Sequence, residues 1–362
     1  MKQVCTLCGR TAVDGTLWCQ EVDCPIGQMP VMLNYGEPFG DLEIVKPLTV
    51  LRASAIYAAV RNGEPVLLKV AHDGHHNRLK REAEWLMQSQ LAKQTISLLP
   101  TLLPAHRNTD YAYGKTIYQG RMRYYCLFEH CDGDFLRELL LKNPQPWYQH
   151  AGWITVSIAQ AVEFLHRRGV LHLALSPEAV LVRFEQDKQG LIPRVKLLDL
   201  GAVSSQQDVG QSWHPGFALT AYTAPELLGE KRPFASQATD VYGTGLIFYE
   251  MLAGHPAYEF RLRTENAIKQ DVLANRKQPL NRTDLTKLPE LAQQATHLIP
   301  NQRLQNLSQF LQALYPLLPP LPKENTTQPW YQHRAVPIVL SVLFVIGLLI
   351  TIVLLATDAT TF

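Results

Sequence analysis

The stretch that decides the fold reads LHRRGVLHLALSPEA at residues 165–179 and VKLLDLG at residues 195–201. Upstream of it, apolar residues recur every three or four positions over 154–165, which is the spacing of a helix with one buried face. Downstream, apolar runs at 180–182 and 195–198 predict a pair of strands. The stretch therefore predicts a helix that leads through an irregular loop into a strand pair.

The residues on the N-terminal side predict a small sheet with one helix. Strand patterns cover 56–60 and 66–71, and Asn62-Gly63 between them is a strong hairpin signal. Over 77–91 the apolar residues follow helical spacing instead. Since no internal repeat is found between residues 40 and 315, we expect this region to be one large two-lobed unit of the α+β class.

Short motifs follow one another in a fixed order through this region. They are Val66-Leu67-Leu68-Lys69, Arg81-Glu82-Ala83, Leu165 to His172, Asp199-Leu200-Gly201, Ala224-Pro225-Glu226, Asp240 to Gly245, and Arg303. Each motif alone is weak, but the set in this order resembles the eukaryotic-like Ser/Thr protein kinase family, including its bacterial transmembrane members. The resemblance covers essentially all of the middle region and implies a two-lobed kinase-like fold, in which Glu226 pairs with Arg303.

The side chains that would hold a nucleotide are present. By resemblance, Lys69 and Glu82 form the ion pair that faces the α- and β-phosphates of ATP, and Asp199 ligates Mg²⁺ through hard oxygen donors. The resemblance therefore implies ATP and Mg²⁺ as candidate ligands.

The catalytic loop has lost its reactive groups. In the family it reads His-Arg-Asp-x-Lys-Pro-x-Asn, whereas here Ala174 stands at the base position, Ser176 at the lysine position and Ala179 at the second metal ligand. Alanine can neither accept a proton nor bind a metal, and a positioned base contributes about 10²–10⁴ in rate. Glu178 remains as an alternative base. The loop therefore predicts a protein that is catalytically inactive or strongly impaired.

The nucleotide pocket departs from the family pattern too. The stretch TVLRASAI at 49–56 has no glycine, although glycines normally let the backbone approach the phosphates. Leu67 replaces a small residue that would face adenine, and Phe128 adds a bulky wall. Leu173 replaces the arginine that reads a phosphorylated activation loop, so activation by phosphorylation of that loop is not expected. These positions leave ATP binding open.

Both ends of the chain carry further signals. Cysteines at the N-terminus follow the pattern Cys5-x2-Cys8 and Cys19-x4-Cys24. Close thiolate pairs of this kind match a tetrahedral zinc site, and without a signal peptide we prefer zinc to two disulfides. At the other end, residues 335–356 carry no charge, which predicts a transmembrane helix. Basic residues precede this run, so single-pass insertion in the cell membrane with cytoplasmic N-terminal domains is expected.

The composition excludes a nucleic-acid-coating chain. Hydrophobic residues make up 46% and charged residues 18%, and the net charge is only +2. Few basic residues lie within 1–30, and a phosphate-binding surface needs clustered positive charge. We therefore expect protein partners or substrates in the cytoplasm, and no nucleic acid.

These observations predict the following organisation. It comprises a zinc ribbon at 1–30, a linker at 31–42, a protein-kinase-like domain at 43–316, a proline-rich juxtamembrane linker at 317–334, a transmembrane helix at 335–356 and a short extracytoplasmic tail at 357–362. The favoured hypothesis is a membrane-anchored pseudokinase that acts as a signalling scaffold or allosteric partner. The alternatives are a low-activity or unconventional Ser/Thr kinase, and a zinc-ribbon module that senses metal or binds a partner.

Overall fold

The small lobe is built on an antiparallel sheet of seven strands. The computed structural model describes residues 3–4, 11–12, 30–106, 111–187, 190–229, 233–261, 263–282 and 287–320. The strands lie in the order β3-β4-β5-β6-β9-β7, and β8 pairs with β9. Their bounds are β3 Pro38–Phe39, β4 Leu42–Val50, β5 Ser54–Arg61, β6 Glu64–Ala71, β7 Leu102–Leu103, β8 Gly114–Tyr118 and β9 Arg121–Glu129.

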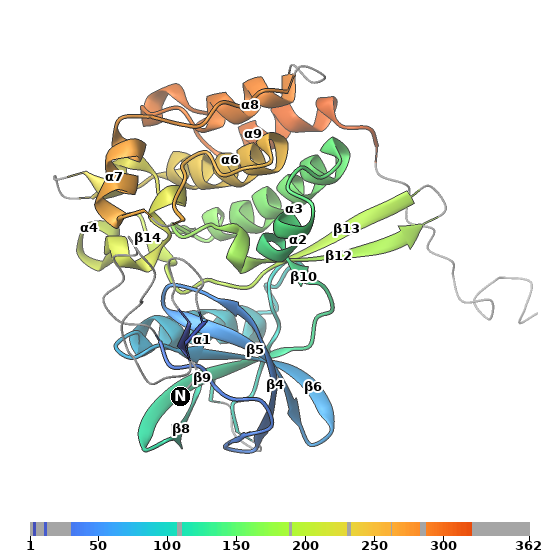
Figure 1. The fold of residues 1–362 in the computed structure, drawn as a ribbon, viewed down its shortest axis with the longest axis vertical. Helices are drawn as coiled ribbons and strands as arrows, with labels where there is room; N and C mark the ends of the chain where they lie inside the picture. Colours follow the sequence, from blue (N-terminus) through green and yellow to red (C-terminus); the bar gives the residue numbers. More distant parts are fainter. Residues whose placement is uncertain are drawn as a thin grey trace, which may run out of the picture. The chain divides into compact units, whose positions relative to one another are not determined.

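The predicted hairpin and helix of this lobe are confirmed. Asn62 and Gly63 both have positive φ, at 59° and 86°, as the tight turn between β5 and β6 requires. Helix α1 (His76–Leu91) follows, and its buried face carries Leu79, Ala83 and Leu86. Figure 1 shows α1 beside the sheet, on the side of the large lobe.

Strand β6 separates two apolar cores because its side chains alternate between the faces of the sheet. Val66, Leu68 and Val70 belong to a core within the small lobe. Leu67 and Ala71 point the other way, into the main core that continues into the large lobe. Residues 31–42, which we expected to be a linker, supply Met32, Leu33, Phe39 and Leu42 to the small-lobe core, so they are part of this lobe.

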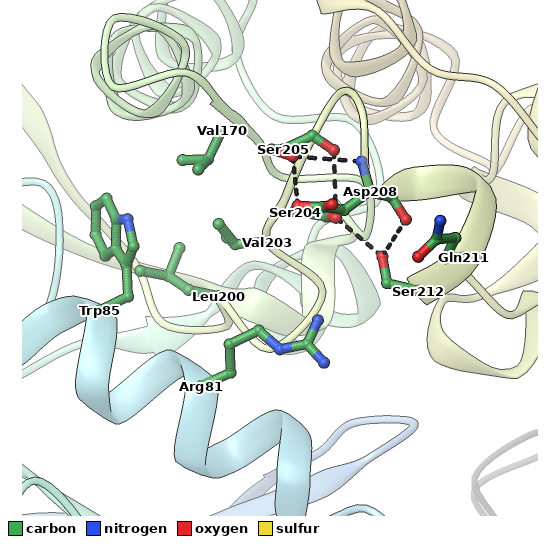
Figure 2. A pocket seen from close by; sticks show the side chains of 10 residues that line it. All are labelled: Arg81, Trp85, Val170, Leu200, Val203, Ser204, Ser205, Asp208, Gln211 and Ser212. Carbon is green, nitrogen blue, oxygen red and sulfur yellow. Dashed lines mark hydrogen bonds between the residues drawn. The ribbon is translucent and has the colours of Figure 1, made fainter.

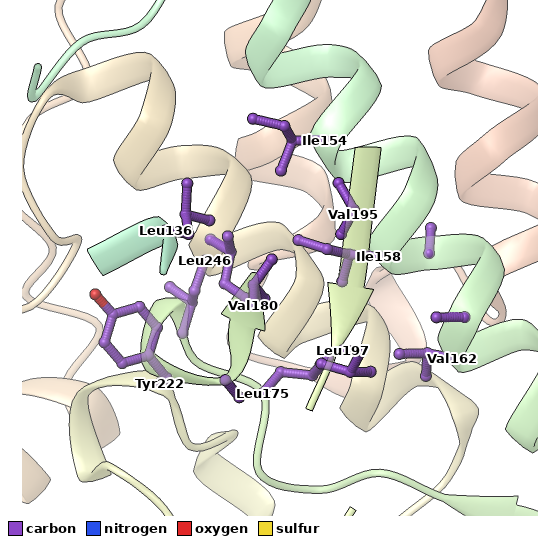
Figure 3. Close-up of a cluster of buried hydrophobic side chains, with 14 of the residues drawn as sticks. Leu136, Ile154, Ile158, Val162, Leu175, Val180, Val195, Leu197, Tyr222 and Leu246 are labelled. Carbon is purple, nitrogen blue, oxygen red and sulfur yellow. The ribbon is translucent and has the colours of Figure 1, made fainter. Parts of the chain in front are cut away.

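The large lobe is mainly helical. Its principal helices are α2 Leu136–Lys142, α3 Tyr148–His166, α5 Pro225–Leu228, α6 Gln237–Ala253, α7 Glu265–Leu273, α8 Lys287–Ala295 and α9 Leu307–Leu314. Helix α6 is buried along almost its whole length, and Gly245 lets α8 approach it, since a Cβ there would lie 2.7 Å from Ala295 Cβ. Figure 3 shows the core, where Ile154, Ile158 and Val162 of α3 pack near the strand pair.

The predicted strand pair lies between the two lobes. It consists of β12 (Val180–Asp187) and β13 (Gly190–Leu197), which pair antiparallel over their whole length. Short β10 (Asp134–Phe135) adds to its edge. The loop 172–179 leads into β12 through the 3₁₀ turn η1 (Pro177–Ala179), and residues 198–201 leave from the end of β13. The loop 172–179 and the segment 198–201 therefore both join this strand pair at the same end, where Val180 pairs with Leu197 (Figure 1).

The membrane part of the predicted fold needs correction. No helix in the described part of the chain, whose last segment ends at Pro320, is long and apolar enough to cross a membrane. The expected helix at 335–356 lies outside the described residues. That prediction used the length and hydropathy of an uncharged run, and such a run does not by itself establish a helix. The transmembrane helix and the single-pass membrane localisation are therefore withdrawn.

The predicted zinc ribbon is represented only by a short strand pair. Strands β1 (Gln3–Val4) and β2 (Thr11–Ala12) pair antiparallel. The four cysteines proposed as metal ligands, Cys5, Cys8, Cys19 and Cys24, lie outside the described residues. The zinc site thus stays a prediction.

Candidate functional site

The centre of the candidate site is a buried group of three charged side chains. Lys69 lies on β6, Glu82 on α1 and Asp199 directly after β13. The Lys69 ammonium lies 2.6 Å from a carboxylate oxygen of Glu82 and 2.6 Å from one of Asp199. The Lys69 side chain is only 2% exposed. The structure therefore brings together the side chains that the sequence singled out for nucleotide binding.

Burial and charge act in opposite directions on this group. Burial alone lowers the pKa of Lys69, but the charges of Asp199 and Glu82 outweigh it and raise that pKa. Burial raises the pKa of Asp199, yet the positive charges of Lys69 and Arg78 hold it below its ordinary value. For Glu82 burial prevails, and its pKa is raised despite Lys69. One ammonium thus has to compensate two buried carboxylates.

Arg78, which the sequence analysis missed, ties α1 to the segment after Asp199. Its Nε donates to the carbonyl of Gly201 at 2.9 Å and one Nη donates to the carbonyl of Phe217 at 3.2 Å. Its guanidinium also lies 4.2 Å from the centre of the Phe217 ring. Arg78 precedes Glu82 by one helical turn, so the i, i+4 spacing was a usable signal. The backbone N–H of Leu200 donates to Glu82 at 3.1 Å, which completes the link.

Asp240 holds the loop 172–174 in shape. Its carboxylate accepts hydrogen bonds from the N–H groups of His172 and Leu173 and from His166 Nε2, each at 2.8 Å. Leu173 has φ +66°, a left-handed conformation that costs a branched residue on the order of 1–2 kcal/mol. Burial raises the pKa of Asp240, but hydrogen bonding and charge from His166, together with His172, lower it overall. The loop is therefore held by one buried carboxylate.

The positions that would carry catalysis lie in an apolar setting. Ala174 belongs with Leu173 to a buried cluster that also contains Val209 and Leu227. Ala179 is fully buried in the main core, and Ser176 is 6% exposed. Among these positions only Ser176 has a polar side-chain atom, a neutral hydroxyl. The site therefore lacks, at these three positions, a group that accepts a proton or neutralises a phosphate.

A buried ion pair joins α5 to the segment between α8 and α9 of the large lobe. Arg303 donates to both carboxylate oxygens of Glu226 at 2.8 Å. Its remaining N–H groups donate to the carbonyls of Ala238, His297 and Leu298. All five donors of the guanidinium are thus used, and the pairing expected from the sequence is observed.

The family model and the similar proteins all indicate a protein kinase domain. The model of the protein kinase domain matches residues 65–315, more than half of the chain. This chain belongs to the protein kinase family. The matched region begins later than the predicted start at residue 43, although β4 and β5 before it complete the same sheet.

Similar curated proteins are Ser/Thr kinases. The chain is 26% identical over 220 residues to MAP kinase-interacting serine/threonine-protein kinase 1 of Xenopus tropicalis, covering 55% of this chain and 46% of that protein. It is 30% identical over 138 residues to a probable serine/threonine-protein kinase of Streptomyces coelicolor, covering 37% and 19%. It is 28% identical over 159 residues to calcium-dependent protein kinase 19 of Arabidopsis thaliana, covering 44% and 27%. The matches thus span less than half of each of these relatives.

The side chains expected at the nucleotide slot of this kinase-family member are buried or already paired. Leu67 and Phe128, the two bulky residues expected to face adenine, are only 1% and 0% exposed. The Lys69 ammonium has Glu82, Asp199 and the carbonyl of Leu198 around it, which leaves no donor directed to a phosphate. At the position of the second metal ligand stands Ala179.

Glu178 is engaged elsewhere and is a poor candidate for a replacement base. Arg137, on α2, donates to Glu178 at 2.6 Å and to Glu250 at 2.5 Å. It also donates to the hydroxyl of Tyr222 at 2.6 Å, and burial, the largest effect, raises the pKa of that hydroxyl well above its usual range. Arg137 escaped the sequence analysis because its partners are far away along the chain.

The segment after Asp199 packs on the large lobe through apolar contacts. Trp213 packs against the cluster of Leu173 and Val209. Strand β14 (Ser204–Ser205) pairs with β11 (Val170–Leu171). A cavity of about 490 Å³ lies between this segment and α1, and Figure 2 shows the serines around it bonded to one another and to Asp208. Leu173 thus contacts this segment through apolar packing. The arginine that the family has at this position would instead bind a phosphate on the segment.

Proposed function

We propose that the chain is a pseudokinase, a protein-kinase fold that acts through binding rather than phosphate transfer. The observation that carries the proposal is the catalytic loop, where Ala174, Ser176 and Ala179 stand at the positions of the base, the lysine and the second metal ligand. Loss of the base alone corresponds to about 10²–10⁴ in rate. The burial of Leu67 and Phe128 and the engagement of Glu178 by Arg137 support the same conclusion.

The proposed role is that of a signalling scaffold or allosteric partner of other proteins. Buried pairs and clusters that hold the fold are complete, such as Glu226–Arg303 and the cluster around Leu173. The segment 200–224 packs on the large lobe through Val209 and Trp213. A fold that keeps these contacts offers a defined surface to a partner.

The test is phosphate incorporation into the purified full chain and into a generic protein substrate. Mass spectrometry would follow incorporation with ATP and Mg²⁺ or Mn²⁺, in the natural chain and in Lys69→Met and Asp199→Asn variants. We expect no incorporation above the variants. Incorporation at ordinary kinase rates that both variants abolish would refute the pseudokinase proposal and would establish an unconventional Ser/Thr kinase.

We also propose that Cys5, Cys8, Cys19 and Cys24 bind one Zn²⁺. The spacing of the pairs supports this, since each pair can present two thiolates from one tight turn. Elemental analysis of the purified chain should find about one zinc per chain, and Cys5→Ser should lower that amount, whereas Cys131→Ser, a change at a thiol outside the motif, should not. Full zinc content in Cys5→Ser would contradict the assignment.

A further inference from the structure

The turn between β4 and β5 is a short, firmly built tip. The N–H of Leu51 donates to the carbonyl of Ser54 at 2.8 Å, so residues 51–54 form a tight turn. His72, the residue after β6, contacts this turn twice. Its N–H donates to the carbonyl of Ala53 at 2.9 Å, and its Nε2 lies 3.0 Å from the carbonyl of Leu51. The tip is thus positioned as a rigid part of the small lobe.

This tip reaches across to the large lobe. A guanidinium nitrogen of Arg52 forms an ion pair with Glu265, the first residue of α7. The other carboxylate oxygen of Glu265 accepts the hydroxyl of Thr220 in η3 (Thr220–Tyr222). Three residues before Arg52, on β4 of the same hairpin, Thr49 donates its hydroxyl to the carbonyl of Glu178 at 3.1 Å. The hairpin therefore contacts the large lobe at two places.

We propose that Arg52 and Glu265 form a clasp that holds the cleft closed and couples α7 to the β4–β5 hairpin. The Arg52 side chain is 13% exposed, and Leu51 beside it is 5% exposed, so the closed tip is largely dry. Glu265 receives both Arg52 and Thr220, so α7 and η3 are joined to the small lobe through a single carboxylate.

The clasp is balanced so that it can open. The Glu265 side chain is 41% exposed, and ion pairs with this much solvent contribute little. Arg52 Nε is buried and has no hydrogen-bond partner among the described residues, which offsets part of the gain of the closed state. The ion pair therefore contributes only a small free energy to the closed arrangement, and a partner that binds the Glu265 carboxylate would remove this contribution.

This inference does not require an inactive catalytic loop. It concerns the conformation of the hairpin, and its test uses no nucleotide and measures no phosphate. A negative result for the clasp would leave the pseudokinase proposal in place. Phosphate transfer by the chain would likewise leave the clasp proposal in place.

The test is limited trypsin cleavage of the full chain after Arg52, followed by mass spectrometry. Cleavage needs the tip to leave the large lobe and the turn at 51–54 to open, so its rate follows the population in which both have occurred when opening is fast. Cleavage after Arg121, the first residue of β9, whose side chain is 57% exposed, serves as the internal reference. Glu265→Gln removes the charge of the clasp. Asp271→Asn is the matched control, because Asp271 lies on the same helix and pairs with Arg263 and Arg276 instead.

We expect Glu265→Gln to raise the Arg52/Arg121 cleavage ratio about two- to five-fold, the range of a partly exposed ion pair. Asp271→Asn should leave the ratio unchanged. Raising the salt concentration should change the ratio more in the natural chain than in Glu265→Gln, because only the natural chain has the Arg52–Glu265 charge pair to lose. Equal ratios in the two variants, or the same salt response in both proteins, would overturn the clasp.

Discussion

Removal of the Lys69 ammonium tests whether the charged group at the centre of the cleft is structural. In the change Lys69→Met, Glu82 and Asp199 keep their buried places but lose the cation that lies 2.6 Å from each of them. Leu200 N–H still donates to Glu82, and Arg78 still acts on Asp199, so the carboxylates are only partly compensated.

The expected loss is large. Removing one partner of a buried ion pair typically costs about 3–5 kcal/mol, because the other charge stays buried and uncompensated. Here two carboxylates depend on one ammonium, so we expect about 4 kcal/mol at pH 7, on the scale of that range. A folded domain has about 5–15 kcal/mol in total, so the variant should be close to its limit of stability.

The loss should become smaller in acid. In the natural chain the pKa of Asp199 is lowered, so its pairing stabilises the fold above the ordinary pKa of the group and that contribution is lost as the pH falls. In the variant both carboxylates lose Lys69, so their pKa values rise and the native state takes up protons at a higher pH than in the natural chain. The difference in the free energy of unfolding between the two proteins should therefore narrow as the pH falls.

Urea unfolding of the full chain, followed by far-UV circular dichroism at pH 7 and pH 5, measures this difference. Lys142→Met is the matched control, because Lys142 is 67% exposed and lies 3.6 Å from Asp134. We expect it to cost less than about 0.5 kcal/mol. If Lys69→Met unfolds at the same urea concentration as Lys142→Met at pH 7, or if its deficit grows at pH 5, the carboxylates are solvated and the reasoning is wrong.

Further substitutions test the supports of the large lobe. Arg303→Met leaves the buried Glu226 carboxylate without its cation and should cost about 3–5 kcal/mol in urea unfolding; a loss below about 1 kcal/mol would contradict the described pairing. Asp240→Asn replaces a carboxylate oxygen that accepts from His166 and His172 by a donor, and should cost about 1–3 kcal/mol. An unchanged unfolding midpoint in Asp240→Asn would show that the loop does not depend on these bonds.

Local sequence patterns predicted the helices, strands and turns well, because these elements depend mainly on residues that are close along the chain. The turn at Asn62-Gly63 follows from residues that accept positive φ, and α1 ends at Leu91, where the helical spacing ends. The ordered motifs placed Lys69, Glu82 and Asp199 in one group. Their spacing in the sequence does not indicate this contact; the resemblance to the family does.

Tertiary contacts between distant and unmatched residues could not be predicted. Arg52 pairs with a carboxylate 213 positions away, and Arg137 donates to groups 41 to 113 positions away. An arginine in an irregular segment looks the same in sequence whether it is solvated or buried. Residues 31–42 were misjudged for a related reason, since the few apolar residues there gain their meaning only from the sheet against which they pack.

Stability explains why the charged group persists although the catalytic loop has changed. Lys69 pairs with both Glu82 and Asp199, so losing its ammonium leaves two buried carboxylates without that cation. Ala174 lies in an apolar cluster, where a carboxylate would need a partner, and the alanine therefore costs the fold nothing. Residues with a structural second role are then retained, and residues needed only for phosphate transfer are free to change. The presence of Lys69 and Asp199 in this chain is consequently evidence about its folding, and the loop around Ala174 is the better indicator of its chemistry.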